Sequence, residues 1–128
     1  MELEKQFIPY KQALKLKELG FKEDCIAYYS ADETKLNLVQ GYNSLMFADD
    51  VHLSNTIKSI PAPLWQQAFD FFREEFKIHT SIQEYDINNY TYLIDDGLNK
   101  DIQAIGFKTY KEARLECLKK LIELCENN

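Results

Sequence analysis

The stretch PLWQQAFDFFREEF, from Pro63 to Phe76, places one tryptophan and four phenylalanines within fourteen residues. Its apolar residues recur at the spacing of one helical face, namely Trp65, Ala68, Phe69, Phe72 and Phe76. A cradle for an aromatic or nucleotide ligand is the alternative use of such a stripe. Each buried aromatic side chain contributes about 2–3 kcal/mol, so a cradle would deprive the domain of its largest apolar contribution. The stretch therefore predicts a core helix that packs against a sheet or another helix.

One more helix is predicted on each side of this core helix. In PYKQALKLKELG, residues 9–20, Pro9 suits the first helical turn and Gly20 suits the left-handed position that follows the last turn. Phe21 is expected to fold back onto that last turn. Near the C-terminus, Thr109 and Glu112 have the spacing of a capping box. The apolar positions after Thr109 cover roughly 200° of the helix circumference, so this helix is expected to have two neighbours.

Strand patterns lie between the predicted helices. They are CIAYYS (25–30), a weaker hairpin of LNLV and SLMF (36–39 and 44–47), KIHTSIQEY and YTYLID around the turn DINN (77–95), and QAIGF (103–107). Residues 48–63 are expected to form an irregular connection that ends at two prolines. These patterns predict one α+β domain over residues 1–128, a mostly antiparallel sheet with three helices packed on one face.

Two surfaces are predicted to carry interactions, and the first is apolar. Leu64 and Phe71 widen the stripe of the middle helix, while Leu115 and Ile122 widen that of the last helix. This surplus predicts a self-association surface that a second copy of the chain covers. The alternative is that the two helices pack on each other.

The second surface is a hairpin face that is rich in tyrosine. If Tyr85 pairs with Tyr90, the period of two puts one set of side chains on the solvent side: His79, Gln83, Tyr85, Tyr90 and Tyr92. Tyrosine is enriched at binding surfaces, because it offers a large contact area and a hydroxyl. The alternative is that these rings simply cover the second face of the sheet. A slip of one residue in the pairing would exchange the two faces.

Composition and charge exclude several classes of function. The 128 residues are 45% hydrophobic and 28% charged, which is typical of a soluble domain, and no apolar run approaches the roughly 20 residues of a membrane span. The start of the chain lacks the apolar core of a signal peptide, so a cytoplasmic location is expected. The net charge is +2 for residues 1–22, −9 for residues 23–101 and +1 for the remainder. The acidic middle repels phosphate backbones, so nucleic-acid binding is not expected, although mimicry of nucleic acid is a remote option.

Motifs for catalysis are scarce in this chain. The four glycines are well separated and form no phosphate-binding loop, so no cofactor is implied. Cys25, Cys117 and Cys125 show neither disulfide nor zinc spacing and are expected to be buried thiols.

Acidic loops are the single constellation that could support catalysis. Asp49, Asp50 and His52, or Asp95 and Asp96 with Asp101, could hold a divalent metal that activates water. The alternative is turn chemistry, in which aspartates bond to their own backbone.

The segments QALKLKELGF, PAPLWQQAFDFFREEF and FKTYKEARLECLKKLIEL resemble a family of small proteins from Bacteroidetes-type bacteria and their phages or prophages. That family has no established activity, and residues 31–60 lie outside the resemblance. The resemblance implies an accessory or mobile-element context. The favoured hypothesis is a non-enzymatic binding or structural protein that acts through protein–protein contacts or self-association. The alternative is a small metal-dependent hydrolase or nucleotide-handling enzyme that uses the acidic loops.

Overall fold

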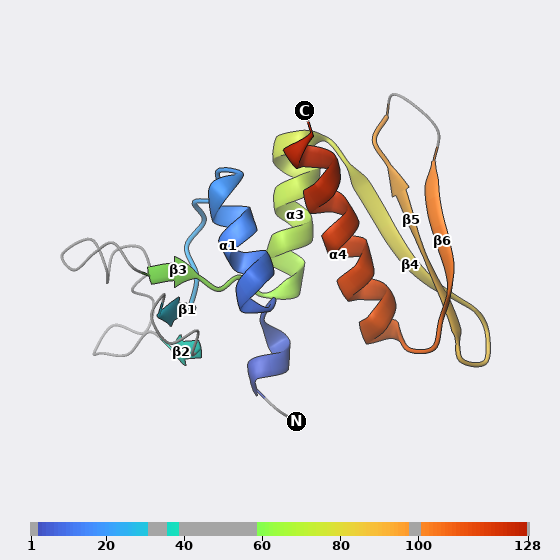
Figure 1. The fold of residues 1–128 in the computed structure, drawn as a ribbon, viewed down its shortest axis with the longest axis horizontal. Helices are drawn as coiled ribbons and strands as arrows, with labels where there is room; N and C mark the ends of the chain where they lie inside the picture. The colour runs from blue at the N-terminus through green and yellow to red at the C-terminus, as the bar shows by residue number, and fades with distance from the viewer. Residues whose placement is uncertain (1–2, 31–35, 39–58, 98–100, 128) are drawn as a thin grey trace. The chain divides into compact units, whose positions relative to one another are not determined.

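The computed structural model describes residues 3–30, 36–38, 59–97 and 101–127 (Figure 1). These residues form α-helices and antiparallel strands, which confirms the predicted α+β class. The described strands form two three-stranded antiparallel sheets rather than the one sheet that was predicted. The chain divides into two compact units, Met1–Ala68 and Phe69–Asn128.

The first unit contains a short 3₁₀ helix, one α-helix and a small sheet. Its elements are η1 (Leu3–Gln6), α1 (Tyr10–Glu18), β1 (Ala27–Ser30), β2 (Leu36–Leu38) and β3 (Ser59–Pro61). The strand order is β2-β1-β3, so β1 is central. Strand β3 lies within the connection that was predicted to be irregular, and that prediction was wrong for residues 59–61. Pro61 is compatible with β3 because an edge strand can tolerate the missing N–H group.

Tyr29 of β1 connects the sheet of the first unit to the start of the chain. Its hydroxyl donates a hydrogen bond of 2.7 Å to the carbonyl of Ile8, and its ring meets Tyr10 edge-on at 5.6 Å. The amide of Ile8 donates to the carbonyl of Pro63 at 3.0 Å. Two distant stretches of sequence are therefore held against the same N-terminal segment.

The predicted end of α1 is confirmed in detail. Gly20 has a φ of +104°, and the amide of Phe21 donates to the carbonyl of Leu16 at 2.9 Å. Phe21 is buried. This arrangement satisfies carbonyl groups that the end of a helix otherwise leaves unpaired.

Helix α3 (Trp65–Phe76) spans the predicted core stretch. Ala68 and Phe72 are fully buried, as the stripe predicted, and Phe71 is buried beside them. Trp65 is half-buried, and its indole N–H donates to the carbonyl of Lys5 at 3.1 Å. The buried face is therefore turned toward Phe71 relative to the predicted stripe.

The second unit packs one helix on one three-stranded sheet. Its elements after α3 are β4 (His79–Asp86), β5 (Asn89–Asp95), β6 (Ile102–Phe107) and α4 (Tyr110–Glu126), with strand order β4-β5-β6. Helix α4 lies along one face of this sheet (Figure 1). The hydroxyl of Thr109 accepts from the amide of Glu112 at 3.1 Å, as the capping-box spacing predicted. The helix buries Ala113, Cys117, Leu118, Leu121, Ile122 and Cys125.

The hairpin register differs from the predicted one by a single residue. Glu84, not Tyr85, lies opposite Tyr90, and an irregularity at Tyr85 restores the pairing of Asp86 with Asn89. The chain makes a two-residue turn here because Asn88 adopts a φ of +58°, a left-handed conformation that asparagine tolerates. The extra residue is absorbed as a β-bulge in β4. The slip moves the residues of β5 to the face opposite the predicted one, while the residues of β4 from His79 to Gln83 keep their predicted faces.

Candidate functional site

The sheet of the second unit presents one face to α4 and the other to solvent. Residues that pair across neighbouring strands share a face, so the register defines the side away from α4. We call this side, together with Tyr85, the outer face; it comprises His79, Ser81, Gln83, Tyr85, Thr91, Leu93, Asp95, Gln103 and Ile105. His79, Gln83 and Tyr85 thus share a face as predicted.

Tyr92 and Tyr90 do not belong to the outer face, which corrects the predicted binding surface. Tyr92 pairs with Ile82 and is 7% exposed, and its ring stacks on Phe107 at 5.8 Å. Burial raises the pKa of its hydroxyl, and Cys117 of α4 raises that pKa further, so Tyr92 lies beneath the helix. The ring of Tyr90 meets the ring of Tyr110, at the start of α4, edge-on at 6.4 Å.

A hydrogen bond spans the outer face from one edge strand to the other. The side-chain amide of Gln103 in β6 donates to the hydroxyl of Tyr85 in β4 at 3.0 Å. Strand β5 lies between these two strands, so the side chains of Tyr85 and Gln103 together span β5. The register puts Thr91 on this path, and Thr91 has no exposed surface. The Thr91 hydroxyl donates to the carbonyl of Ala104 at 2.6 Å, so this buried polar group has a hydrogen-bond partner.

Apolar side chains remain exposed beside this hydrogen bond. Tyr85 is 57% exposed and Ile105 is 62% exposed, and both belong to the outer face. Ile87, in the turn that follows β4, is 87% exposed. Within the described residues these are the three most exposed large hydrophobic side chains. Surfaces that combine exposed apolar groups with a fixed tyrosine are typical of protein-binding sites.

The sheet of the second unit is strongly acidic. Its described residues, 79–97 and 101–107, include Glu84, Asp86, Asp95, Asp96 and Asp101, and they include no lysine or arginine. Lys77 and Lys108 stand just outside the two ends of this range. Asp95 belongs to the outer face, and the other carboxylates lie elsewhere on the same sheet. The apolar contact area of the outer face therefore belongs to a sheet of net negative charge, which favours a partner of positive charge.

The acidic loops were the predicted site of metal chemistry. Asp49, Asp50 and His52 lie outside the described residues. The carboxylate of Asp95 accepts from the amide of Gly97 at 2.8 Å, which is the turn chemistry that was the alternative. Among the residues that the structure describes, no group of three or more histidines, cysteines, aspartates or glutamates could hold a metal ion.

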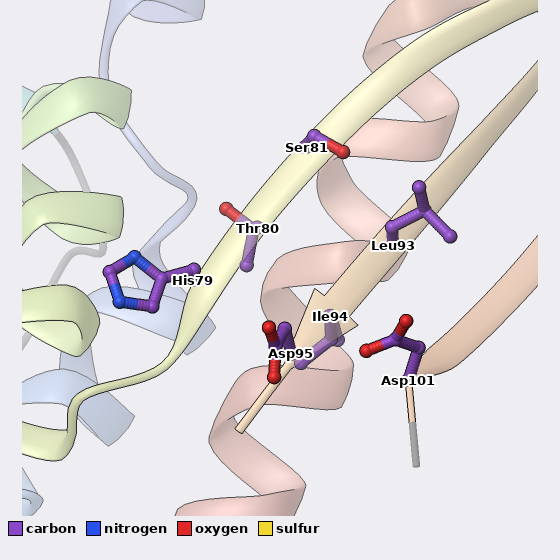
Figure 2. Close-up of a pocket in the computed structure, with 7 residues that line it drawn as sticks. All are labelled: His79, Thr80, Ser81, Leu93, Ile94, Asp95 and Asp101. Atoms are coloured by element: carbon purple, nitrogen blue, oxygen red, sulfur yellow. The ribbon is translucent and has the colours of Figure 1, made fainter. Parts of the chain in front are cut away.

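A hollow of about 270 Å³ lies at the end of β4 and β5 and is lined by His79, Thr80, Ser81, Leu93, Ile94, Asp95 and Asp101. Figure 2 shows the ring of His79 on the side of β4 that faces away from Asp101. The imidazole and the two carboxylates therefore do not converge. The hollow adds the carboxylate of Asp101 to the end of the outer face that carries Asp95.

The three cysteines are buried, as predicted. Burial raises the pKa of Cys117 to about 12 and that of Cys125 to about 11. A nucleophilic cysteine requires the opposite shift, because the thiolate is the reactive form. Cys117 and Cys125 therefore act as small apolar groups in the core of the second unit.

The predicted self-association residues do not form one exposed patch. Phe71 is 3% exposed and Ile122 is 5% exposed in the single chain. Both side chains are therefore already buried and offer almost no surface to a second copy. Leu64 and Leu115 are half-buried. Self-association through Leu64 and Leu115 stays a prediction.

Sequence reasoning missed Gln103 and Ile105, which β6 contributes to the outer face. Their positions depend on strand order, for which the sequence contains no local pattern. No family model, curated protein or solved structure matches the chain. Among the described residues, no helix is long and apolar enough to cross a membrane.

Proposed function

We propose that this protein is a non-enzymatic binding protein whose outer face docks a positively charged segment of a partner protein. The observation that carries the proposal is the bond between Gln103 and Tyr85, which holds an exposed aromatic ring across an acidic sheet. The protein acts in the cytoplasm as an accessory factor. Its mobile-element context follows from the resemblance of the three helical segments to the phage and prophage family.

The fixed position of Tyr85 reduces the cost of binding. An interface must immobilise its side chains, at about 0.5–1.5 kcal/mol for each mobile one. The hydrogen bond from Gln103 already restricts the Tyr85 side chain. Ile105 is β-branched, so its χ1 angle is restricted as well. The outer face thus presents contact area that loses little entropy when a partner docks.

The negative charge of the sheet favours a partner segment of positive charge. An acidic surface attracts a basic segment over a distance that the salt concentration sets, about 10 Å at 0.1 M ionic strength. Association with such a partner should therefore weaken as salt is added. A nucleic acid would be repelled by the same carboxylates.

Affinity purification from the source organism tests the proposal through matched serine substitutions. Ile105→Ser removes an exposed isoleucine from the outer face, while Ile26→Ser removes one that is 48% exposed in the first unit. We expect the first variant to lose a partner with a basic binding segment, and the second to retain it. Retention of every partner by Ile105→Ser and Tyr85→Ser would refute the proposal.

Self-association is a second mode of contact that Leu64 and Leu115 would support. Light scattering at micromolar concentration measures it directly. A strictly monomeric protein in this measurement would exclude the dimer. It would not contradict the docking proposal, because the outer face needs no second copy to bind a partner.

A further inference from the structure

We infer that the basic segment binds in an extended conformation, as an additional strand on the edge of β4 that no strand of the described residues occupies. This inference rests on the proposed function and specifies how the partner docks. Strand addition supplies main-chain hydrogen bonds for affinity and leaves the alternate side chains to provide specificity.

The two edges of the sheet differ in their capacity to pair with another strand. β4 and β6 are the edge strands, since the order is β4-β5-β6. β4 has eight residues without glycine or proline, and its pairing with β5 is regular from His79 to Glu84. β6 has six residues, and its register is interrupted where Gly106 adopts a φ of +95°. Backbone groups in a bulge cannot all continue a ladder, so β4 is the better template.

β4 also lacks the devices that protect an edge strand. Such strands are usually short, interrupted by proline or a bulge, or marked by lysine. From His79 to Gln83 this strand has none of these features, and its bulge is confined to the tip at Tyr85. The side chains of His79, Ser81 and Gln83 are exposed on the outer face, so the side chains of an added strand could contact them.

Carboxylates lie near both ends of this regular edge, on β4 itself at one end and on or beyond the neighbouring strand β5 at the other. Glu84 and Asp86 lie near the turn, while Asp95 lies opposite His79, with Asp101 in the adjacent hollow. The regular edge spans about 17 Å from His79 to Glu84, at roughly 3.3 Å per residue. An added strand with cationic side chains five residues apart would direct one toward the side of Asp95 and the other toward the side of Glu84, because residues five apart lie on opposite faces. Uncharged β-favouring residues between those cations would complete the match.

A second copy of the chain fits this edge less well. Each copy would bring the same acidic sheet, without lysine or arginine in its described residues. Pairing two such edges adds like charges, which is unfavourable at short range. A basic partner removes this repulsion and replaces it with attraction.

Synthetic peptides test strand addition without altering the protein. The probe has six residues, with lysine at both ends, alternating valine and threonine between them, and blocked termini. In an added strand, only every second amide points toward β4. One N-methylated version carries methyl groups on that set of amides and cannot pair with β4. The other version carries them on the alternate set and can still pair. A version with glutamate in place of lysine controls for charge.

We expect the lysine peptide to shift and protect the backbone amides of residues 79–84 in NMR and hydrogen-exchange experiments. One N-methylated version should bind at least tenfold more weakly than the other, and the glutamate version should not bind. Equal binding of both methylated peptides, with shifts at Tyr85 and Ile105, would refute strand addition while the docking function stands. Absence of binding by the lysine peptide at millimolar concentration would also refute strand addition. Amide protection of β4 in a dimer of the free protein would assign the edge to a second copy and overturn the inference.

Discussion

The side-chain amide of Gln103 donates to the hydroxyl of Tyr85 at 3.0 Å, although the two residues belong to opposite edge strands of one sheet. The bond joins β4 to β6 over β5 on the outer face, while α4 covers the other face. It explains how a tyrosine that is 57% exposed can still have a defined orientation.

Substitution of Gln103 by alanine should lower the free energy of unfolding by about 0.5–1.5 kcal/mol, the usual net value of one hydrogen bond. Gln83→Ala is the matched control, because Gln83 is exposed on the same face and lies outside this bond. Urea denaturation measures both variants. Equal stability of the two would mean that the bond between Tyr85 and Gln103 contributes nothing.

Replacement of Tyr92 by alanine should destabilise the protein strongly, by roughly 3–5 kcal/mol, because it removes a buried ring beneath α4. Tyr85→Ala should cost no more than about 1–2 kcal/mol, since that ring is largely exposed. Thermal melting distinguishes the two variants. A larger loss for Tyr85 than for Tyr92 would contradict the observed register.

Lys77 follows the last turn of α3 with a φ of +59°, a conformation that costs a residue with a side chain about 1–2 kcal/mol. Lys77→Gly should therefore be more stable than Lys77→Ala by about 0.5–1 kcal/mol. Both variants lose the bond from the lysine ammonium to the carbonyl of Glu74, so the comparison isolates the backbone. Denaturant midpoints that favour alanine would show that Lys77 is not strained.

Alkaline pH should destabilise the protein through Cys117. The folded state raises the pKa of this thiol from 9.0 to about 12, so the folded form keeps its proton where the unfolded form loses it. The stabilising contribution is complete below pH 9 and is lost as the pH rises toward 12. Cys117→Ala should lower overall stability but flatten its decline between pH 9 and 11. An unchanged slope in that variant would show that Cys117 does not cause the decline.

Addition of Mg²⁺, Mn²⁺ or Zn²⁺ up to millimolar concentration should leave the melting midpoint unchanged, because the described residues gather no set of three metal ligands. A ligand at one hundred times its dissociation constant stabilises the folded state by about 2.7 kcal/mol, which calorimetry would detect. A reproducible rise with one metal would favour the hydrolase hypothesis over the binding function. Asp95→Asn and Asp101→Asn would then show whether the hollow holds that metal.

The helices and their ends could be predicted because they depend on residues close together in the chain. Gly20 ends α1, and Thr109 begins α4, through bonds that span no more than five residues. The burial of Cys117 followed from its place in an apolar helical stripe. The acidic character of the sheet was also evident, since charge is a property of composition.

Tertiary structure alone decided which residues share the outer face. The register of β4 and β5 depends on the left-handed conformation of Asn88 and on a bulge at Tyr85, and a shift of one residue moves Tyr92 from solvent to core. The place of Gln103 opposite Leu93 depends on β6 adding to β5, a contact between segments with no shared local pattern. Local sequence determines a helix because its bonds are short-range. A sheet face instead depends on long-range pairing, so the candidate site could be located only in the folded chain.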